Sequence, residues 1–436
     1  MVHDLVIEGK VFLGQDFQTC CIGIDDGKIT AIRKIATGHR RVTCPHQLIL
    51  PAAIDCHVHF RDPGFLHKET ITTGSTAAVY GGVSCVFDMP NTKPVTDSIQ
   101  ILQEKQKRIQ QASLIDMGLY AALTEKNIDE VQPLAGFCHG FKMFLGKSTN
   151  ALTFPLSLFQ PAFDQIKKTT KPLCIHAEDG RCLHHHKKQA QNLKEYALIR
   201  PVECERIAIQ FVLKAIQGVN HPVHFCHISS EDALAMLANH PSHVSIGVTP
   251  HHALLNVSRA EASIQPQSFY KMNPPLRTVS DQSAVLDHII NGSVDMIESD
   301  HAPHALDEKN VDFQDAPAGV PGVETMYPMF LSLAIQNKLS FSRLTSLLCR
   351  NPASFLQIPK GAIQVGFDAD IVMIDPKRRV NISSEMLHSK AGWTPFKEMS
   401  AVFPKQMFLR GHCVLEDGDV QVSPGNGMVV SVDETL

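Results

Sequence analysis

The sequence lacks long hydrophobic runs, dense charge of either sign and any recognisable export signal. Charged residues make up 19% of its 436 residues, the net charge is -4, and no dense basic run points to a nucleic-acid partner. No apolar stretch approaches the roughly 18 residues of a membrane span. The N-terminal residues lack the basic and long apolar regions of a secretory signal. We therefore expect a cytoplasmic globular protein with no membrane or nucleic-acid partner.

Regular cysteine spacing is also missing, although the chain holds 12 cysteines. They are scattered through apolar segments, as at Cys85, Cys174, Cys226 and Cys349. No paired spacing suggests a disulfide framework or a zinc ribbon. We expect reduced thiols that behave as small buried hydrophobic side chains.

Short apolar runs alternate with helix-compatible stretches through the middle of the chain. The eight runs end near His59, Met89, Leu123, Phe144, His176, His227, Val248 and Asp300. This alternation over residues 52–360 predicts an α/β fold, a (β/α)8 TIM-like barrel. A doubly wound open sheet is the alternative, but no glycine-rich dinucleotide fingerprint follows an early run.

Both ends of the chain read as short strands instead. Residues 5–7, 21–24 and 28–32 alternate at one end, and residues 371–374 begin a similar texture at the other. Neither end has enough apolar residues for a core of its own. We predict one small β-sandwich domain built from residues 1–51 plus 361–436, beside the barrel of residues 52–360.

Histidines and an aspartate stand at the ends of several apolar runs. His57 and His59 share one strand face, so two imidazoles can bind one metal. His176, His227 and Asp300 end later runs, and barrel strands bring such ends to one mouth. Any one of these histidines alone would suit a structural hydrogen bond. Their joint placement favours a site for zinc-like metals.

Lys142 lies near the end of another of these apolar runs, in the segment Gly140–Phe144. Considered alone it is a surface or ion-paired lysine, because an ammonium has no lone pair for a metal. Addition of CO₂ to the neutral amine would give an anionic carbamate that can bridge two metals. The sequence alone leaves both interpretations open.

Two motifs together resemble the signatures of the dihydroorotase family, cyclic amidohydrolases of pyrimidine synthesis in the amidohydrolase superfamily. The motifs are Asp55–Pro63 and Ser299–His304. Further similar segments are Asp88–Pro94, Asn273–Arg277, Gly319–Thr325 and Ser389–Phe396, and the length suits the class I branch. The resemblance implies reversible interconversion of N-carbamoyl-L-aspartate and L-dihydroorotate.

The resemblance also implies a role for each site residue. It implies two zinc ions, one held by His57, His59 and Asp300, the other by His176 and His227, with carboxylated Lys142 as the bridge. Asp300 would in addition move the proton from the attacking water to the leaving nitrogen. The substrate carboxylate would bind Arg61, Asn91 and His304, and the ring amide would bind Asn273.

Other interpretations remain open at this point. A related cyclic amidohydrolase, an allantoinase or a hydantoinase/dihydropyrimidinase, could use the same metal ligands, and a scaffold paralogue would have lost them. We expect a homodimer, and some relatives dock with aspartate transcarbamoylase. Residues Asp315–Gly322 are expected to form a lid, and Cys226 to point away from His227.

Overall fold

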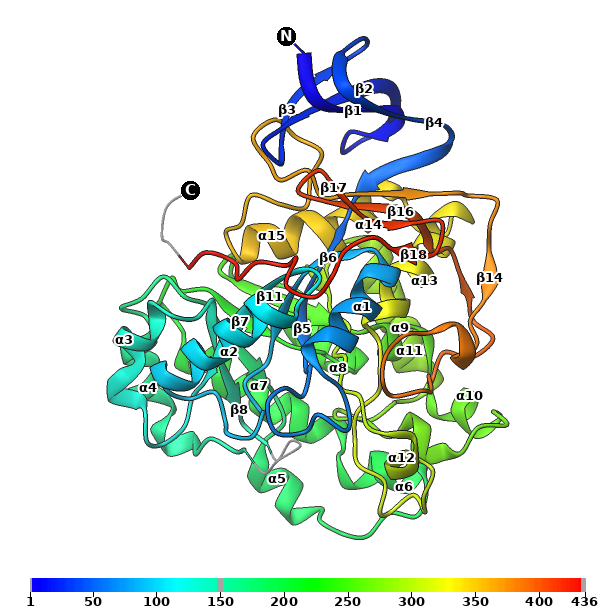
Figure 1. Ribbon diagram of the computed structural model, residues 1–436. Coiled ribbons are helices and arrows are strands. Elements are labelled where there is room, and N and C mark those ends of the chain that lie inside the picture. Colours follow the sequence, from blue (N-terminus) through cyan, green and yellow to red (C-terminus); the bar gives the residue numbers. More distant parts are fainter. Residues whose placement is uncertain (1, 147–151, 433–436) are drawn as a thin grey trace.

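The centre of the chain forms a closed barrel of parallel strands (Figure 1). The computed structural model describes residues 2–146 and 152–432, and within them eight strands follow one another around the barrel in sequence order. They are β5 (Ala53–Val58), β6 (Val83–Asp88), β7 (Asp116–Ala122), β8 (Gly140–Phe144), β9 (Leu173–His176), β10 (Val223–Phe225), β11 (Val244–Val248) and β12 (Met296–Ile297). A parallel bridge between Val58 and His301 joins the first strand to the segment after the last. The predicted barrel is confirmed.

Helices cover the outside of these strands, which explains why the strands read as nearly continuous apolar runs. The longer ones are α1 (Ile71–Gly81), α2 (Ile99–Ala112), α7 (Val202–Ala215), α11 (Val279–Asn291) and α13 (Val323–Ile335). The shorter helices, of which α6, α10 and α12 lie in connecting segments and not against the barrel strands, are α3 (Val131–Ala135), α4 (Phe159–Ile166), α5 (Gly180–His185), α6 (Leu193–Ile199), α8 (Glu231–Leu237), α9 (Pro250–Leu254), α10 (Val257–Glu261), α12 (Leu306–Lys309), α14 (Phe341–Thr345) and α15 (Asn351–Phe355). Local sequence starts several of them. Thr70 and Ser230, for example, each accept a hydrogen bond from a backbone amide in the first turn of α1 and α8.

Strands from both ends of the chain share a second sheet, seen beyond one end of the barrel in Figure 1. Its order is β18 (Asp419–Val420), β17 (His412–Glu416), β16 (Pro404–Leu409), β13 (Ile371–Ile374), β4 (Thr37–Pro51), β1 (Val2–Phe12), β2 (Phe17–Asp25) and β3 (Lys28–Arg33). Antiparallel pairing of β4 with β13 joins the two ends, with Ile49 opposite Met373. A separate short pair consists of β14 (Val380–Asn381) and β15 (Ser400–Ala401). The prediction of a sheet made from both termini is confirmed.

Parts of the C-terminal region also lie against the barrel. The backbone of Met117 in β7 exchanges hydrogen bonds with Met428 and Val430, both 2.9 Å long. In the segment that follows the last barrel strand, the His304 carbonyl oxygen accepts a hydrogen bond from Trp393 Nε1 at 2.8 Å. The division into residues 1–51 plus 361–436 and 52–360 therefore stays a prediction, and its residues 1 and 433–436 lie outside the described ranges.

A disulfide joins α5 to α7, between Cys182 and Cys204. The expectation of reduced thiols was wrong for these two cysteines, whereas the other ten are free. The two residues are 22 positions apart, a separation that carries no disulfide signal of its own. Asp179 brings them together, because its side chain accepts from the Cys182 amide and its backbone amide donates to the Cys204 carbonyl.

Membrane-spanning helices were also sought in the described ranges. None of the helices there is long and apolar enough to cross a bilayer.

Candidate metal centre and substrate cavity

One cavity at the carboxyl ends of the barrel strands gathers residues from distant parts of the chain. Its lining is His57, His59, Arg61, Asn91, Phe144, His176, His227, Asn273, Asp300, Ala302, Ala318 and Gly319. The residues predicted from sequence are all in this lining except Lys142 and His304. Side chains separated by more than 200 positions thus meet at one place.

The first donor group consists of His57, His59 and Asp300. Nε2 of His57 lies 3.4 Å from Asp300 Oδ1, and Nε2 of His59 lies 3.1 Å from the same oxygen. Burial alone would raise the pKa of Asp300, but the neighbouring His57 and His59 lower it well below its usual range. One ligand atom from each of the three residues thus lies within 4.8 Å of the other two, and one of the three groups is an ionised carboxylate. Such a group suits a divalent metal.

His176 and His227 form a second donor group. His176 Nδ1 lies 3.1 Å from His227 Nε2, and both residues are buried. Burial lowers the pKa of His176, and burial with the neighbouring His176 lowers the pKa of His227 well below its usual range. Both rings are therefore neutral imidazoles near neutral pH, the form that binds metals.

Lys142 lies next to these histidines rather than on the surface. Its side chain is completely buried, and Nζ contacts Cys226 Sγ at 2.9 Å. Among the described residues it forms no ion pair. Burial raises the pKa of the Cys226 thiol to about 12, so this neighbour is uncharged at neutral pH.

The contact also shows that Cys226 points into the barrel, so the expectation that it points away from His227 was wrong. Alternation of side chains requires extended backbone. His227 instead has φ 41°, which turns the chain so that both side chains face inward.

Positive φ angles recur among the cavity residues. Arg61 has φ 61° and Asp300 has φ 44°, in the left-handed region that non-glycine residues rarely adopt. Such conformations cost free energy and persist where the surrounding structure enforces them, often at functional sites.

Arg61 brings a positive charge to the cavity. Its Nε donates to the Pro303 carbonyl at 3.1 Å, and Nη2 lies 3.4 Å from His304 Nε2. It forms no ion pair with a carboxylate of the described residues. Burial lowers the pKa of Arg61 to about 10, so the guanidinium stays charged at neutral pH.

His304 lies behind Arg61 and does not line the cavity. Its Nδ1 is 2.9 Å from Lys68 Nζ, and its Nε2 is 3.0 Å from the Ala318 carbonyl oxygen. Burial lowers the pKa of His304 to about 3. The ring is therefore neutral and packs against Arg61 in this structure.

The two asparagines of the cavity are each fixed by a neighbour. Asn273 Oδ1 accepts from the Tyr196 hydroxyl at 2.6 Å, which leaves its amide nitrogen as the group that faces other partners. Asn91 Oδ1 lies 2.6 Å from His59 Nδ1 and so orients this metal-binding candidate.

Sequence reasoning missed the carboxylates behind the histidines. Glu178 Oε2 lies 2.8 Å from His176 Nε2 and also pairs with Arg200. Glu298 Oε2 lies 3.3 Å from His57 Nδ1. A signal was available, because each glutamate is two positions from a predicted ligand and strand alternation puts such residues on one face.

Comparison with known proteins gives a consistent result. The Amidohydrolase family profile matches residues 48–412. A protein of Methanosarcina acetivorans named Dihydroorotase is 36% identical over 438 residues, which cover 96% of this chain and 93% of that protein. A protein of Thermoplasma acidophilum with the same name is 37% identical, and the match covers 95% of this chain and 95% of that protein. The solved L-hydantoinase (dihydropyrimidinase) of Arthrobacter aurescens is similar with a TM-score of 0.93 and 25% identity, over 99% of this chain and all of that one.

Proposed function

The chain belongs to the amidohydrolase family and is a metal-dependent cyclic amide hydrolase, and from this premise we propose that it is a dihydroorotase. Its reaction would be the reversible interconversion of N-carbamoyl-L-aspartate and L-dihydroorotate in pyrimidine synthesis. Relatives named Dihydroorotase, similar over nearly the whole chain, support this substrate.

The donor set of the cavity fits two zinc ions. His57, His59 and Asp300 would hold one, and His176 and His227 the other. His176 Nδ1 and His227 Nε2 face each other at 3.1 Å, and two neutral imidazole nitrogens placed in this way can share one metal ion. When bound, the metals would make water nucleophilic near neutral pH and polarise the ring amide carbonyl.

The protein residues would supply binding and proton transfer. Asp300 is an ionised acceptor at the metal-facing side of the cavity and would take the proton of the attacking water, then pass it to the leaving nitrogen. The Asn273 amide nitrogen would donate to the substrate ring, because its oxygen already accepts from Tyr196.

The single observation that carries the choice of substrate is the buried guanidinium of Arg61. A buried cation with no carboxylate partner in the described chain is costly unless an anion joins it. Dihydroorotate and N-carbamoyl-aspartate both bring a carboxylate that the planar guanidinium can bind.

Arg61→Met tests this assignment. We expect the KM for dihydroorotate to rise about 10- to 100-fold, because a charge-assisted hydrogen bond contributes about 1.5–3 kcal/mol. Steady-state hydrolysis of dihydroorotate by metal-quantified protein measures it. Arg108→Met, at a half-exposed arginine paired with Asp62, is the matched control and should leave KM unchanged. An unchanged KM in Arg61→Met would contradict the proposal that Arg61 binds the substrate carboxylate.

A hydantoinase is the second candidate, favoured by the TM-score of 0.93 to the L-hydantoinase structure. Hydantoins without a carboxylate give Arg61 no partner. The same assay with hydantoin and allantoin therefore separates the two functions. Turnover of hydantoin above that of dihydroorotate, insensitive to Arg61→Met, would favour the hydantoinase.

Carboxylation of Lys142 belongs to the same proposal. A carbamate would replace a buried cation that has no ion pair by an anion able to bridge the two metals. Protein prepared with ¹³C-bicarbonate should show a carbamate resonance by NMR that Lys142→Met lacks. Equal spectra for the two proteins would contradict carboxylation.

The remaining expectations concern the protein in the cell. Cytoplasmic location, a homodimer, docking with aspartate transcarbamoylase and lid motion of Asp315–Gly322 stay predictions. For the proposed lid, Lys309 provides an anchor, since its buried Nζ donates to the carbonyls of Pro317 and Gly319 at 2.9 and 3.1 Å.

A further inference from the structure

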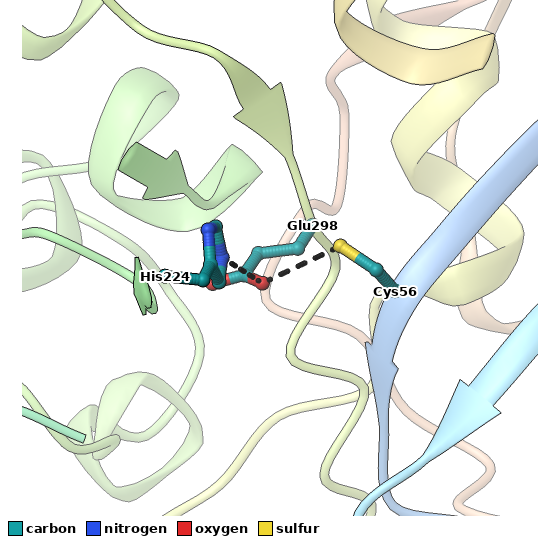
Figure 2. Close-up of side chains that lie close together, drawn as sticks. All are labelled: Cys56, His224 and Glu298. Atoms are coloured by element: carbon teal, nitrogen blue, oxygen red, sulfur yellow. Dashed lines mark hydrogen bonds and ion pairs between the residues drawn. The ribbon is translucent and has the colours of Figure 1, made fainter. Parts of the chain in front are cut away.

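A second cluster of ligand-type side chains lies inside the barrel, next to the cavity histidines. Figure 2 shows Glu298 between Cys56 and His224, with its carboxylate directed at both. Glu298 Oε2 lies 3.7 Å from Cys56 Sγ and 3.2 Å from His224 Nε2. The three ligand atoms all lie within 4.8 Å of one another.

Three separate strands supply this cluster, and each side chain is fixed. Cys56 belongs to β5, His224 to β10, and Glu298 follows β12. The His224 ring is held at Nδ1 by Ser245 Oγ at 2.9 Å, and Glu298 Oε1 accepts from the His227 backbone amide at 2.6 Å. All three side chains are fully buried, so their positions are set by the packing of the barrel interior.

A glycine makes the space for the cluster. A Cβ atom at Gly247 in β11 would come within 2.7 Å of both Glu298 Oε1 and His224 Nε2. The φ of Gly247 is not in the left-handed region, so backbone conformation does not require glycine there. The close approach of the glutamate and the histidine does.

The two distances to Glu298 suit three ligands of a tetrahedral zinc ion. Zinc binds sulfur at about 2.3 Å, imidazole nitrogen at about 2.0–2.1 Å and carboxylate oxygen at about 2.0–2.2 Å, which puts tetrahedral ligands about 3.3–3.6 Å apart. The observed separations of 3.2 and 3.7 Å need only small adjustment. A thiolate and a carboxylate together would also offset both charges of the ion.

We propose that Cys56, His224 and Glu298 bind a third metal ion, a zinc-like divalent cation that prefers sulfur and nitrogen ligands. This site uses none of the cavity ligands and goes beyond the proposed hydrolysis. It lies directly behind His57, whose Nδ1 is 3.3 Å from Glu298 Oε2. An overlapping group, His57, Cys226 and Glu298, competes for the same glutamate and must be separated by experiment.

Cobalt(II) loading of the whole protein provides a readout specific to this site. A thiolate ligand gives a near-ultraviolet charge-transfer band, and the residues proposed to hold the cavity metals include no thiol. We expect the wild-type protein to show the band. Cys56→Ser and His224→Gln should each lose the band and one equivalent of bound metal per chain. Cys85→Ser is the matched control and should keep both, because this buried thiol of the same interior belongs to no ligand group within the described ranges.

Further variants make the outcome decisive. Asp300→Asn disturbs the cavity site and should keep the band, so failure of the proposed hydrolysis and failure of the third site are distinguishable. Absence of the band in wild-type protein would overturn the proposal. So would a band that persists in folded Cys56→Ser or His224→Gln but disappears in Cys226→Ser, because the ion would then belong to the overlapping group.

Discussion

At the scale of single residues, three of the cavity histidines, His57, His59 and His176, have a partner at the ring nitrogen that faces away from the proposed metals. A metal-binding imidazole uses one ring nitrogen, and a partner at the other fixes ring orientation and raises its basicity. His176 has Glu178 in this place, His57 has Glu298, and His59 has the Asn91 amide oxygen. The geometry of the centre thus depends in part on Glu178 and Glu298, which do not line the cavity.

Glu178→Gln tests this dependence. The amide keeps the shape but loses the charge that faces His176 and Arg200. We expect metal affinity to fall about 10- to 100-fold, the usual effect of losing such a partner. Competition with a chelator of known affinity measures it. Glu203→Gln, at an exposed glutamate of α7, is the control, and equal affinities in both variants would contradict the role of Glu178.

The sequence predicted which residues meet in the cavity better than it predicted their surroundings. Each predicted ligand ends an apolar run, and a barrel brings such ends together. The orientation of Cys226 was predicted wrongly because it depends on φ of His227, and the position of His304 outside the cavity lining depends on its packing against Arg61. Such features follow from packing rather than from residue spacing.

Individual elements carry their own local determinants, as the hairpin between β2 and β3 shows. Asp26 and Gly27 have φ 49° and 76°, the left-handed pair that a tight two-residue hairpin requires. Next to this turn, Asp25 accepts hydrogen bonds from His3 at 2.7 Å and from Thr30 at 2.5 Å. The aspartate therefore ties β1, β2 and β3 together.

Asp25 should also make this sheet sensitive to acid. The hydrogen bonds from Thr30 and His3 lower the pKa of Asp25 from 3.8 to about 2 in the folded protein. Its stabilising contribution is therefore present above the unfolded pKa of 3.8 and is lost as pH falls through about 2. We expect Asp25→Asn to be less stable than wild type near neutral pH, with the difference shrinking toward pH 2. Urea unfolding over a pH series measures this, and a difference independent of pH would contradict it.

At the level of elements, the sequence predicted the barrel strands and helices because period and length are local signals. The contact of Met428 with Met117 and the disulfide of Cys182 with Cys204 were not predicted. Both join segments whose proximity is decided only after the barrel has closed.

In the whole molecule, a buried charge cluster links the terminal sheet to the barrel. Lys360 Nζ lies 2.8 Å from a carboxylate oxygen of each of Asp116, Asp368 and Asp370. Asp116 belongs to barrel strand β7, whereas Asp368 and Asp370 lead into β13 of the sheet. Arg410, which follows β16, pairs with Asp116 as well. Lys28 of β3 pairs with Asp368, so three cations face three carboxylates where the two parts of the chain meet.

Lys360→Met should consequently destabilise the entire fold and not only the sheet. Removing the lysine leaves Arg410 on Asp116 and Lys28 on Asp368, but it takes away the cation that faces the buried carboxylate of Asp370. Breaking a buried ion pair in this way costs about 3–5 kcal/mol. We expect a loss of this size in the free energy of unfolding, measured by urea denaturation with probes in both parts, and the two transitions should shift together. Lys338→Met, at an exposed lysine after α13, is the control and should stay within about 0.5 kcal/mol of wild type. A shift confined to the sheet probe would mean that the cluster stabilises β13 locally and does not couple the sheet to the barrel.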